Sequence, residues 1–147
     1  LLALVTNHQF LQRANRMAGL LPDITPENEA FWSGGATGEL RIMACNACDH
    51  RIQPPQLICP KCLSRDVAPR VASGRGTIHS YTINHQSWLP GLAVPYALAI
   101  VDLDDQPGVR LTTRLEVPSF DAIRIGSAVT VDFEPREDVY IPFFRMA

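Results

Sequence analysis

Hydrophobic positions in the first third of the chain recur mainly at helical spacing. In the opening segment they are Phe10, Leu11, Ala14, Met17 and Ala18. The pair Thr6-Asn7 can cap a helix, and Gly19 ends the pattern, so we expect a helix over this segment.

A second, shorter helix is expected just before the first cysteine pair. Thr25 suits the N-cap and Pro26 the first helical position, while Ser33-Gly34-Gly35 ends the pattern. The helix carries the aromatic pair Phe31 and Trp32. We interpret this pair as an anchor that packs the helix onto the next domain; the alternative is an aromatic pair that faces a ligand.

Strand-like patterns dominate the rest of the chain. Glu39 to Ala44 is expected to be a strand, and Arg51 to Gln56, with Pro54-Pro55, is extended. Five further strands are expected at Gly76–His85, Tyr96–Leu103, Val109–Leu115, Ala128–Phe133 and Tyr140–Met146. Pro142 suggests an edge position or bulge in the last of them. Short strands joined by loops are typical of a small closed or nearly closed β-barrel.

The composition is that of a soluble globular protein, with no apolar run of the roughly 20 residues that a membrane helix needs. The apolar start, Leu1 to Val5, is short and lacks a basic flank, so it does not resemble a signal peptide, and we expect a cytoplasmic protein. The net charge is −2, and the arginines are scattered from Arg13 to Arg145. Nucleic-acid binding through a clustered positive field is therefore not favoured.

The four cysteines of the chain form the pattern C-x2-C-x10-C-x2-C, with Cys45, Cys48, Cys59 and Cys62 as the sulfur donors. Each C-x2-C knuckle directs two thiolates to one point, and two knuckles make the tetrahedral cage that zinc prefers. The alternatives are iron, which the same cage holds, and two disulfides in a secreted protein. We favour one structural zinc ion, which would stabilise a ribbon too small to fold alone. His50 either donates to a thiolate or is simply exposed.

No catalytic motif is present: the chain lacks nucleophile-elbow, P-loop and dinucleotide-binding patterns. His79 and His85 are placed where they could meet a carboxylate, but surface histidines are more common. Asp102, Asp104 and Asp105 precede Gln-Pro-Gly and are interpreted as turn residues. Independent catalysis is therefore not expected.

Two sets of residues are candidates for contact with a ligand or partner. Arg110 and Arg114 are four apart on a strand and share a face, which either meets a phosphate or carboxylate or is simply solvated. The long loop from Asn84 to Pro95 carries Trp88 and other apolar residues. It is either a binding surface or a lid that folds onto the barrel.

The order of these features resembles a known family, the OB-fold acyl-CoA-associated proteins with an N-terminal rubredoxin-like zinc ribbon. The resemblance covers Pro26 to Ala147 and rests on several strings besides the knuckles. They are Glu29-Ala30-Phe31-Trp32, Gly38-Glu39-Leu40-Arg41, Pro54-Pro55, Gly74-Arg75-Gly76-Thr77-Ile78-His79-Ser80-Tyr81-Thr82, Pro95-Tyr96-Ala97-Leu98-Ala99, Ile125-Gly126-Ser127-Ala128-Val129 and Ile141-Pro142-Phe143-Phe144-Arg145. The family usually has glycine where Asp49 and Leu63 stand, so we expect a somewhat distorted second knuckle that still binds metal.

The resemblance implies a mainly β protein with N-terminal helices in residues 1–37, a zinc ribbon in 38–70 and a five-stranded OB-fold barrel in 71–147. It also implies a non-catalytic accessory subunit of thiolase-superfamily enzymes, including thiolase-like aldolases of steroid side-chain degradation, that helps to bind or channel acyl-CoA. The candidate contact residues are then Trp88, Arg75, Arg110 and Arg114. The alternative functions are a single-strand nucleic-acid-binding OB module and an iron electron carrier.

Overall fold

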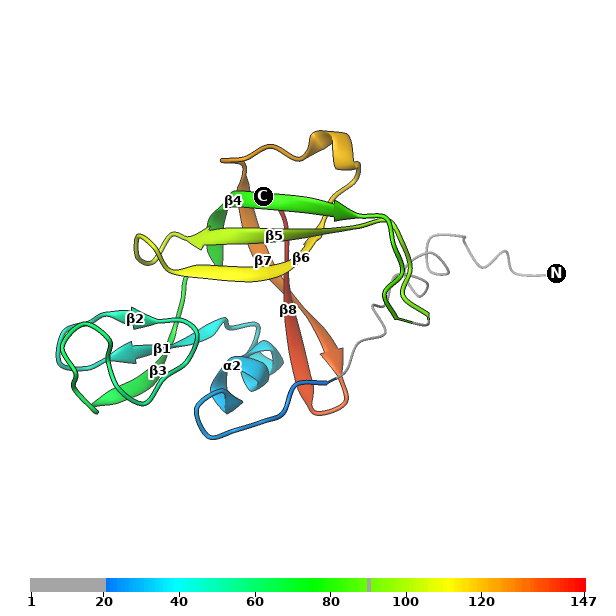
Figure 1. Cartoon of the computed structure of the whole chain (residues 1–147). Coiled ribbons are helices and arrows are strands. Elements are labelled where there is room, and N and C mark those ends of the chain that lie inside the picture. The colour runs from blue at the N-terminus through cyan, green and yellow to red at the C-terminus, as the bar shows by residue number, and fades with distance from the viewer. Residues whose placement is uncertain (1–20, 90) are drawn as a thin grey trace.

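The computed structural model describes residues 21–89 and 91–147 (Figure 1). The helix expected over residues 10–18 lies outside them. The helical elements are α2 (Glu29–Ser33) and the 3-10 turns η1 (Gly34–Thr37) and η2 (Phe120–Ala122). The strands are β1 (Arg41–Cys45), β2 (Arg51–Ile52), β3 (Val67–Val71), β4 (Arg75–Asn84), β5 (Tyr96–Leu103), β6 (Arg110–Glu116), β7 (Ala128–Arg136) and β8 (Val139–Met146). The described chain is therefore mainly β, as expected.

The strands form two sheets. β2, β1 and β3 make a three-stranded antiparallel sheet that carries the cysteines, and the other five strands close into a barrel in the order β4-β5-β6-β8-β7. The barrel closes through β4 with β7 and through a parallel contact between β6 and β8, where Leu115 lies opposite Phe144. Figure 1 shows the small sheet at one end of the molecule, below the barrel.

The expected helix over the Thr25 segment begins later than the sequence suggests. Thr25 to Asn28 form a turn, in which the Asn28 side chain accepts from the Thr25 backbone N–H at 2.8 Å, and α2 starts at Glu29. The Glu29 backbone N–H donates to the Thr25 carbonyl at 2.9 Å, so one helical turn after Thr25 leads into α2, whose regular part begins only at Glu29. The helix keeps only five residues.

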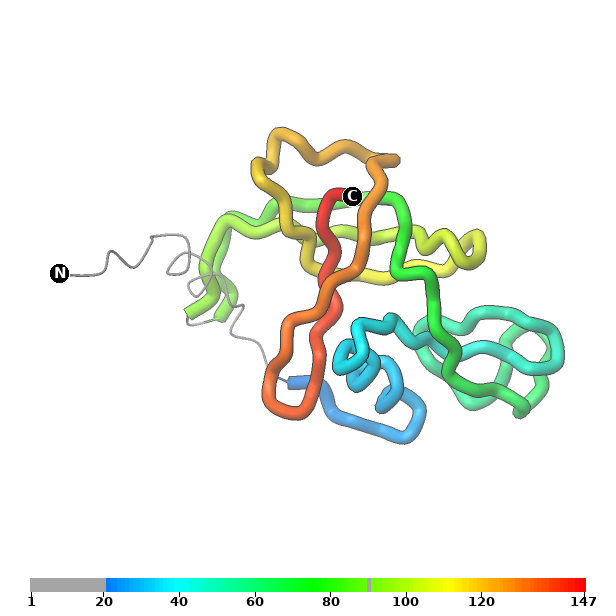
Figure 2. Tube along the Cα trace, turned by 180° about the vertical axis from the view of Figure 1, so that it is seen from behind, coloured from blue at the N-terminus to red at the C-terminus, as the bar shows by residue number. Residues whose placement is uncertain are grey.

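A single apolar core joins α2, the start of the small sheet and the barrel. Phe31, Leu40 and Ile42 belong to the same buried cluster as the barrel residues Val101 and Phe144. Seen from behind in Figure 2, α2 lies beside the hairpin of β7 and β8, which it contacts. The interpretation of Phe31 and Trp32 as a packing anchor is confirmed, since Phe31 is buried in this core and the partly buried Trp32 packs against it.

Pro142 occupies an edge-like place within β8. It pairs with Phe133 of β7, whereas β6 joins β8 further along, at Phe144 and Arg145. The Pro142 carbonyl accepts instead from the Thr113 hydroxyl of β6 at 3.1 Å. A strand without a ladder partner on one side tolerates proline, which has no N–H to donate.

The small sheet and the barrel are also joined by one side chain. Gln106, in the turn between β5 and β6, accepts from the Arg51 backbone N–H at 2.8 Å and lies 3.1 Å from Nδ1 of His50. The Cys45 backbone N–H in turn donates to the His50 carbonyl at 2.9 Å. The His50 ring thus contacts the barrel through Gln106 and is not simply exposed, while the backbone N–H of His50 donates to the Cys48 sulfur.

The described part of the chain has no helix with the length and apolar character that a membrane crossing requires.

Candidate metal centre and groove

The four cysteine side chains converge at one end of the small sheet. Cys45 ends β1, and Cys48, Cys59 and Cys62 lie in the two loops beside it. Their sulfur atoms all lie within 4.8 Å of one another. Two of these distances join the knuckles: Cys45 to Cys62 and Cys48 to Cys59, both at 3.6 Å.

These distances fit a metal cage better than disulfides. Four sulfurs placed tetrahedrally at about 2.3 Å from one zinc ion lie about 3.8 Å apart. A disulfide bond is about 2.05 Å long, and all four cysteines are free. The donor set is all sulfur, which suits zinc or iron and leaves no open coordination position for activating water. Bound zinc would supply folding free energy to the ribbon.

The pKa values of the thiols also favour a metal cage. Burial raises the pKa of Cys59, but the backbone N–H groups of Cys62 and Lys61 and the neighbouring thiols outweigh it and lower the pKa to about 7. The backbone N–H of His50 lowers the pKa of Cys48, but burial and the other thiols raise it to about 12. One thiol thus stays protonated and donates to a neighbouring thiolate. All four thiols can ionise together only when a cation is bound.

The two knuckles make the same turn in spite of their different sequences. Asp49 has φ of 61° and Leu63 has φ of 62°, and each donates its backbone N–H to the first cysteine of its knuckle at 2.9 Å. The distortion expected at Leu63 is therefore absent. A leucine in this left-handed conformation costs roughly 1–2 kcal/mol relative to the right-handed one.

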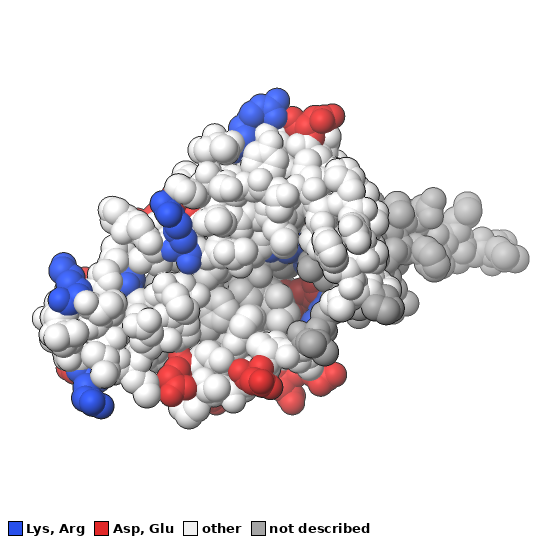
Figure 3. Space-filling view, viewed as in Figure 1, with Lys and Arg blue, Asp and Glu red and all other residues white. Residues whose placement is uncertain are grey.

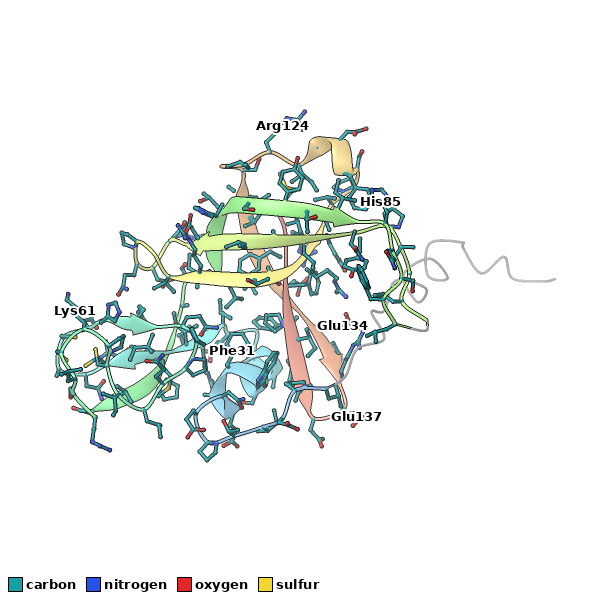
Figure 4. All side chains as sticks on the ribbon, viewed as in Figure 1. Phe31, Lys61, His85, Arg124, Glu134 and Glu137 are labelled. Carbon is teal, nitrogen blue, oxygen red and sulfur yellow. The ribbon has the colours of Figure 1, made fainter. Side chains whose placement is uncertain are left out.

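A groove opens between α2 and the barrel, with a volume of about 370 Å³. Its apolar walls come from Phe31 and Trp32 of α2 and from Leu98, Leu111, Ile141 and Phe143 of the barrel. Figure 3 shows the hollow on this face of the molecule, and Figure 4 labels Phe31 and Glu134, which line it from α2 and β7. Its size is within the range typical of small-molecule sites.

Charged side chains line the barrel side of the groove. Arg114 donates to Glu134 at 2.7 Å, and Arg136 donates to the other oxygen of the same carboxylate at 2.9 Å. The guanidinium of Arg114 also stacks 4.7 Å from the centre of the Phe143 ring, and its Nε is buried without a partner. Arg114 was selected from the sequence as a contact residue, whereas Glu134 and Arg136 were missed. Their spacing of two residues on a strand, which places them on one face, was the available signal.

We expect Glu134→Gln to lower stability by about 2 kcal/mol at pH 7, because the charge-assisted hydrogen bonds from both arginines are lost. Burial raises the pKa of Glu134, but Arg114 and Arg136 outweigh it, so this pKa lies below the ordinary value. The contribution of the carboxylate is therefore present above the unfolded pKa of about 4.3 and disappears as the pH falls through the folded pKa.

Denaturant titrations at several pH values would test this expectation. The difference between wild type and Glu134→Gln should shrink as the pH falls from about 5 toward 3. Glu116→Gln is the matched control, since Glu116 also pairs with Arg114 but is more exposed. A difference that does not change with pH would contradict the assignment.

The other selected arginines are engaged with carboxylates on the barrel surface. Asp102 accepts from Arg110 at 2.7 Å and lies 2.8 Å from Nδ1 of His79, and the Arg110 hydrogen bond is the main cause of a lowered Asp102 pKa. Arg75 lies 4.0 Å from Asp104. His79 thus meets a carboxylate, but the described residues give its ring no hydroxyl or thiol partner.

The interpretation of the aspartates as turn residues is confirmed in part. Asp104 and Asp105 lie in the turn after β5, where Asp105 accepts from the backbone and hydroxyl of Ser73. Asp102 is instead a residue of β5. Arg110 and Arg114 share the outward face of β6, as expected, because the residues between them alternate in burial.

The loop between β4 and β5 has features of a binding surface and of a lid that folds onto the barrel. Leu92 folds inward and is buried, whereas Trp88 is 66% exposed and Leu89 and Val94 are also exposed. The Trp88 indole N–H donates to Asn84 at 3.1 Å, which holds the ring against its own loop. The exposed side chains form an apolar surface that none of the described residues covers.

Two family models match consecutive parts of the chain. Residues 32–68 match the rubredoxin-like zinc ribbon domain of ChsH2, and residues 69–134 match the C-terminal OB-fold domain of ChsH2. The first match contains all four cysteines and supports a structural zinc at this site.

Curated relatives include two hydratase subunits. The chain is 34% identical over 127 residues to a probable enoyl-CoA hydratase alpha subunit of Thermomonospora curvata, covering 86% of this chain and 39% of that protein. It is 30% identical over 118 residues to the 3-oxo-4,17-pregnadiene-20-carboxyl-CoA hydratase alpha subunit of Mycobacterium tuberculosis, covering 79% and 36%. The chain therefore spans less than two fifths of the length of either relative.

Solved structures include a chain of the Ltp2-ChsH2(DUF35) aldolase, which is 33% identical. The TM-score is 0.77, and the match covers 86% of this chain and 98% of that one. A DUF35-family protein of unknown function from Sulfolobus solfataricus shares the fold, with a TM-score of 0.57 and 17% identity over 83% of this chain and 86% of that one.

Proposed function

Because the chain belongs to the ChsH2 family of zinc-ribbon and OB-fold proteins, we propose that it is a non-catalytic accessory subunit of a thiolase-like enzyme. One observation carries the proposal: this chain matches nearly the whole of a chain from the Ltp2-ChsH2(DUF35) aldolase. The two hydratase relatives, both described as alpha subunits, also point to an assembly with another subunit.

The distribution of chemistry in the chain agrees with an accessory role. The cysteines fit a closed metal cage, and His79 is paired with a carboxylate and lacks a nucleophile among the described residues. The reaction would then take place on the partner. This chain would contribute a rigid surface and part of a substrate path.

The groove beside α2 is the proposed contact for an acyl-CoA thioester. Its apolar walls suit a carbon chain, and Arg114 and Arg136, which both pair with Glu134, form its charged side. Of the arginines selected from the sequence, Arg114 is the one that lines this groove, whereas Arg75 and Arg110 face Asp104 and Asp102. The substrate class, including steroid side-chain thioesters, is suggested by the name of the mycobacterial relative.

A single-strand nucleic-acid function receives less support. Such OB barrels use a positive groove with aromatic stacking platforms. Here the barrel arginines Arg110, Arg114 and Arg145 each pair with a carboxylate, which reduces the positive field of the barrel.

Co-expression of this chain with an Ltp2-like protein from the same genome tests the proposal. We expect the two to co-purify with fixed stoichiometry, and the complex to cleave or form a CoA thioester faster than the partner alone. A homodimeric thiolase that needs no small subunit is the control and should not be retained. Failure to bind the Ltp2-like protein or to change its activity would refute the accessory role.

A further inference from the structure

The second knuckle carries an unusual concentration of exposed aliphatic side chains. We name residues 57–65 the second-knuckle loop. In it Leu57 is 54% exposed, Ile58 39% and Leu63 75%. Two backbone hydrogen bonds, from Cys59 to the Ser64 carbonyl and from Leu63 to the Cys59 carbonyl, fold the loop tightly. The three exposed side chains therefore all come from one short, tightly folded segment at the end of the ribbon.

Leu63 combines a positive φ with an exposed side chain, and folding alone does not readily explain this combination. The corresponding turn of the first knuckle uses Asp49, a residue type that tolerates positive φ, and its carboxylate pairs with Arg70. Leu63 adopts the same unfavourable conformation and is mostly exposed. The Leu63 backbone N–H closes the knuckle turn, but glycine would do so without this strain, so the exposed leucine side chain itself calls for another explanation.

The same loop carries two basic residues without a carboxylate partner. Lys61 and Arg65 are exposed, and no ion pair joins either of them to a described residue, whereas Arg41 and Arg70 of the small sheet are paired. Figure 4 places Lys61 at the ribbon end of the molecule, and Figure 3 shows basic side chains there and acidic ones along the edge formed by α2 and the β7–β8 hairpin. The surface is thus apolar at its centre and positive at its margin.

We propose that the second-knuckle loop is a docking surface that inserts Leu63 into an apolar, carboxylate-rimmed pocket of the thiolase-like partner. The proposal rests on the accessory role argued above and deepens it by naming one contact surface. Aliphatic side chains fill protein pockets, and the metal cage would hold the loop in its bound shape before binding, which reduces the entropy lost on association. The loop has no aromatic side chain on which a nucleic-acid base could stack.

Leu63→Gly separates a docking role from a structural one. Glycine accepts positive φ without strain, so this variant should keep its zinc and be as stable as wild type or more so. Titration calorimetry with the purified Ltp2-like partner should nevertheless show binding weakened roughly tenfold or more. Lys61→Glu should also weaken binding, with a larger effect at low salt. Ile125→Ala is the control: Ile125 is 69% exposed on the barrel, and its loss should leave binding unchanged.

Each outcome has a defined meaning. Wild-type affinity in both Leu63→Gly and Lys61→Glu would overturn the docking surface while leaving the accessory role intact. Absence of partner binding by the wild type would overturn both. A salt-dependent shift of a single-stranded oligonucleotide that is lost in Lys61→Glu, with partner binding unaffected, would reassign the surface to nucleic acid.

Discussion

Replacement of Cys59 by serine is expected to release the metal and unfold the three-stranded sheet. The buried cluster of the ribbon consists of Met43, Ile52 and two of the cysteines, Cys45 and Cys59. So small a core does not offset the loss of chain entropy, whereas structural zinc supplies apparent binding free energies of about 10–16 kcal/mol in zinc-finger peptides. Without the fourth ligand the metal dissociates, and the sheet loses the interaction that contributes most to its stability.

Unfolding of the ribbon should also destabilise the barrel. Leu40 and Ile42 belong to the barrel core but adjoin or lie on β1, so unfolding of the ribbon withdraws buried apolar area from the barrel. We expect the melting temperature of Cys59→Ser to fall by about 10 °C or more. The measured zinc content should fall from stoichiometric to near zero, and hydrogen exchange should show loss of protection in β1 and β3.

Lys61→Ala is the matched control for this experiment. Lys61 lies between two of the ligands, is exposed and forms no ion pair with the described residues, so its removal should leave zinc content and melting unchanged. Full zinc occupancy and native hydrogen-exchange protection in Cys59→Ser would contradict a structural metal site at these cysteines.

Phe144→Ala should cause the largest loss of stability within the barrel, about 3–5 kcal/mol. The Phe144 side chain is fully buried, on the strand that closes the barrel by pairing with both β6 and β7. Removing it deletes the largest fully buried side chain and leaves a cavity that the surrounding strands can only partly collapse. Equilibrium denaturation with urea measures the change directly.

Tyr81→Ala provides the comparison for the barrel. Tyr81 lies on β4 and is 38% exposed, so its truncation should cost about 1 kcal/mol or less. A loss below about 1.5 kcal/mol for Phe144→Ala would contradict the position of this ring at the centre of the core.

The sequence located β4, β5, β6 and β8 to within one residue at each end, but ended β7 three residues too early. Along β5 and β6 every second residue is buried, and the expected segments differ from the observed strands by a residue at most. β3 was missed because it reads Val-Ala-Pro-Arg-Val and its residues are half-buried or exposed. It is an edge strand, and Pro69 is tolerated there because an edge strand has no second neighbour to bond.

The proposed ligands of the metal centre came from the sequence alone, since each knuckle directs its thiolates through a turn of a few residues. Such local geometry is encoded in spacing, as is the alternation of the strands. The groove is different: Phe31 and Glu134 both line it only because the hairpin of β7 and β8 packs against α2 and η1. Tertiary structure likewise placed the side chain of Gln106 on His50 and left the aliphatic residues of the second knuckle exposed. Contacts between distant segments depend on how the whole core packs, and no short-range pattern records that.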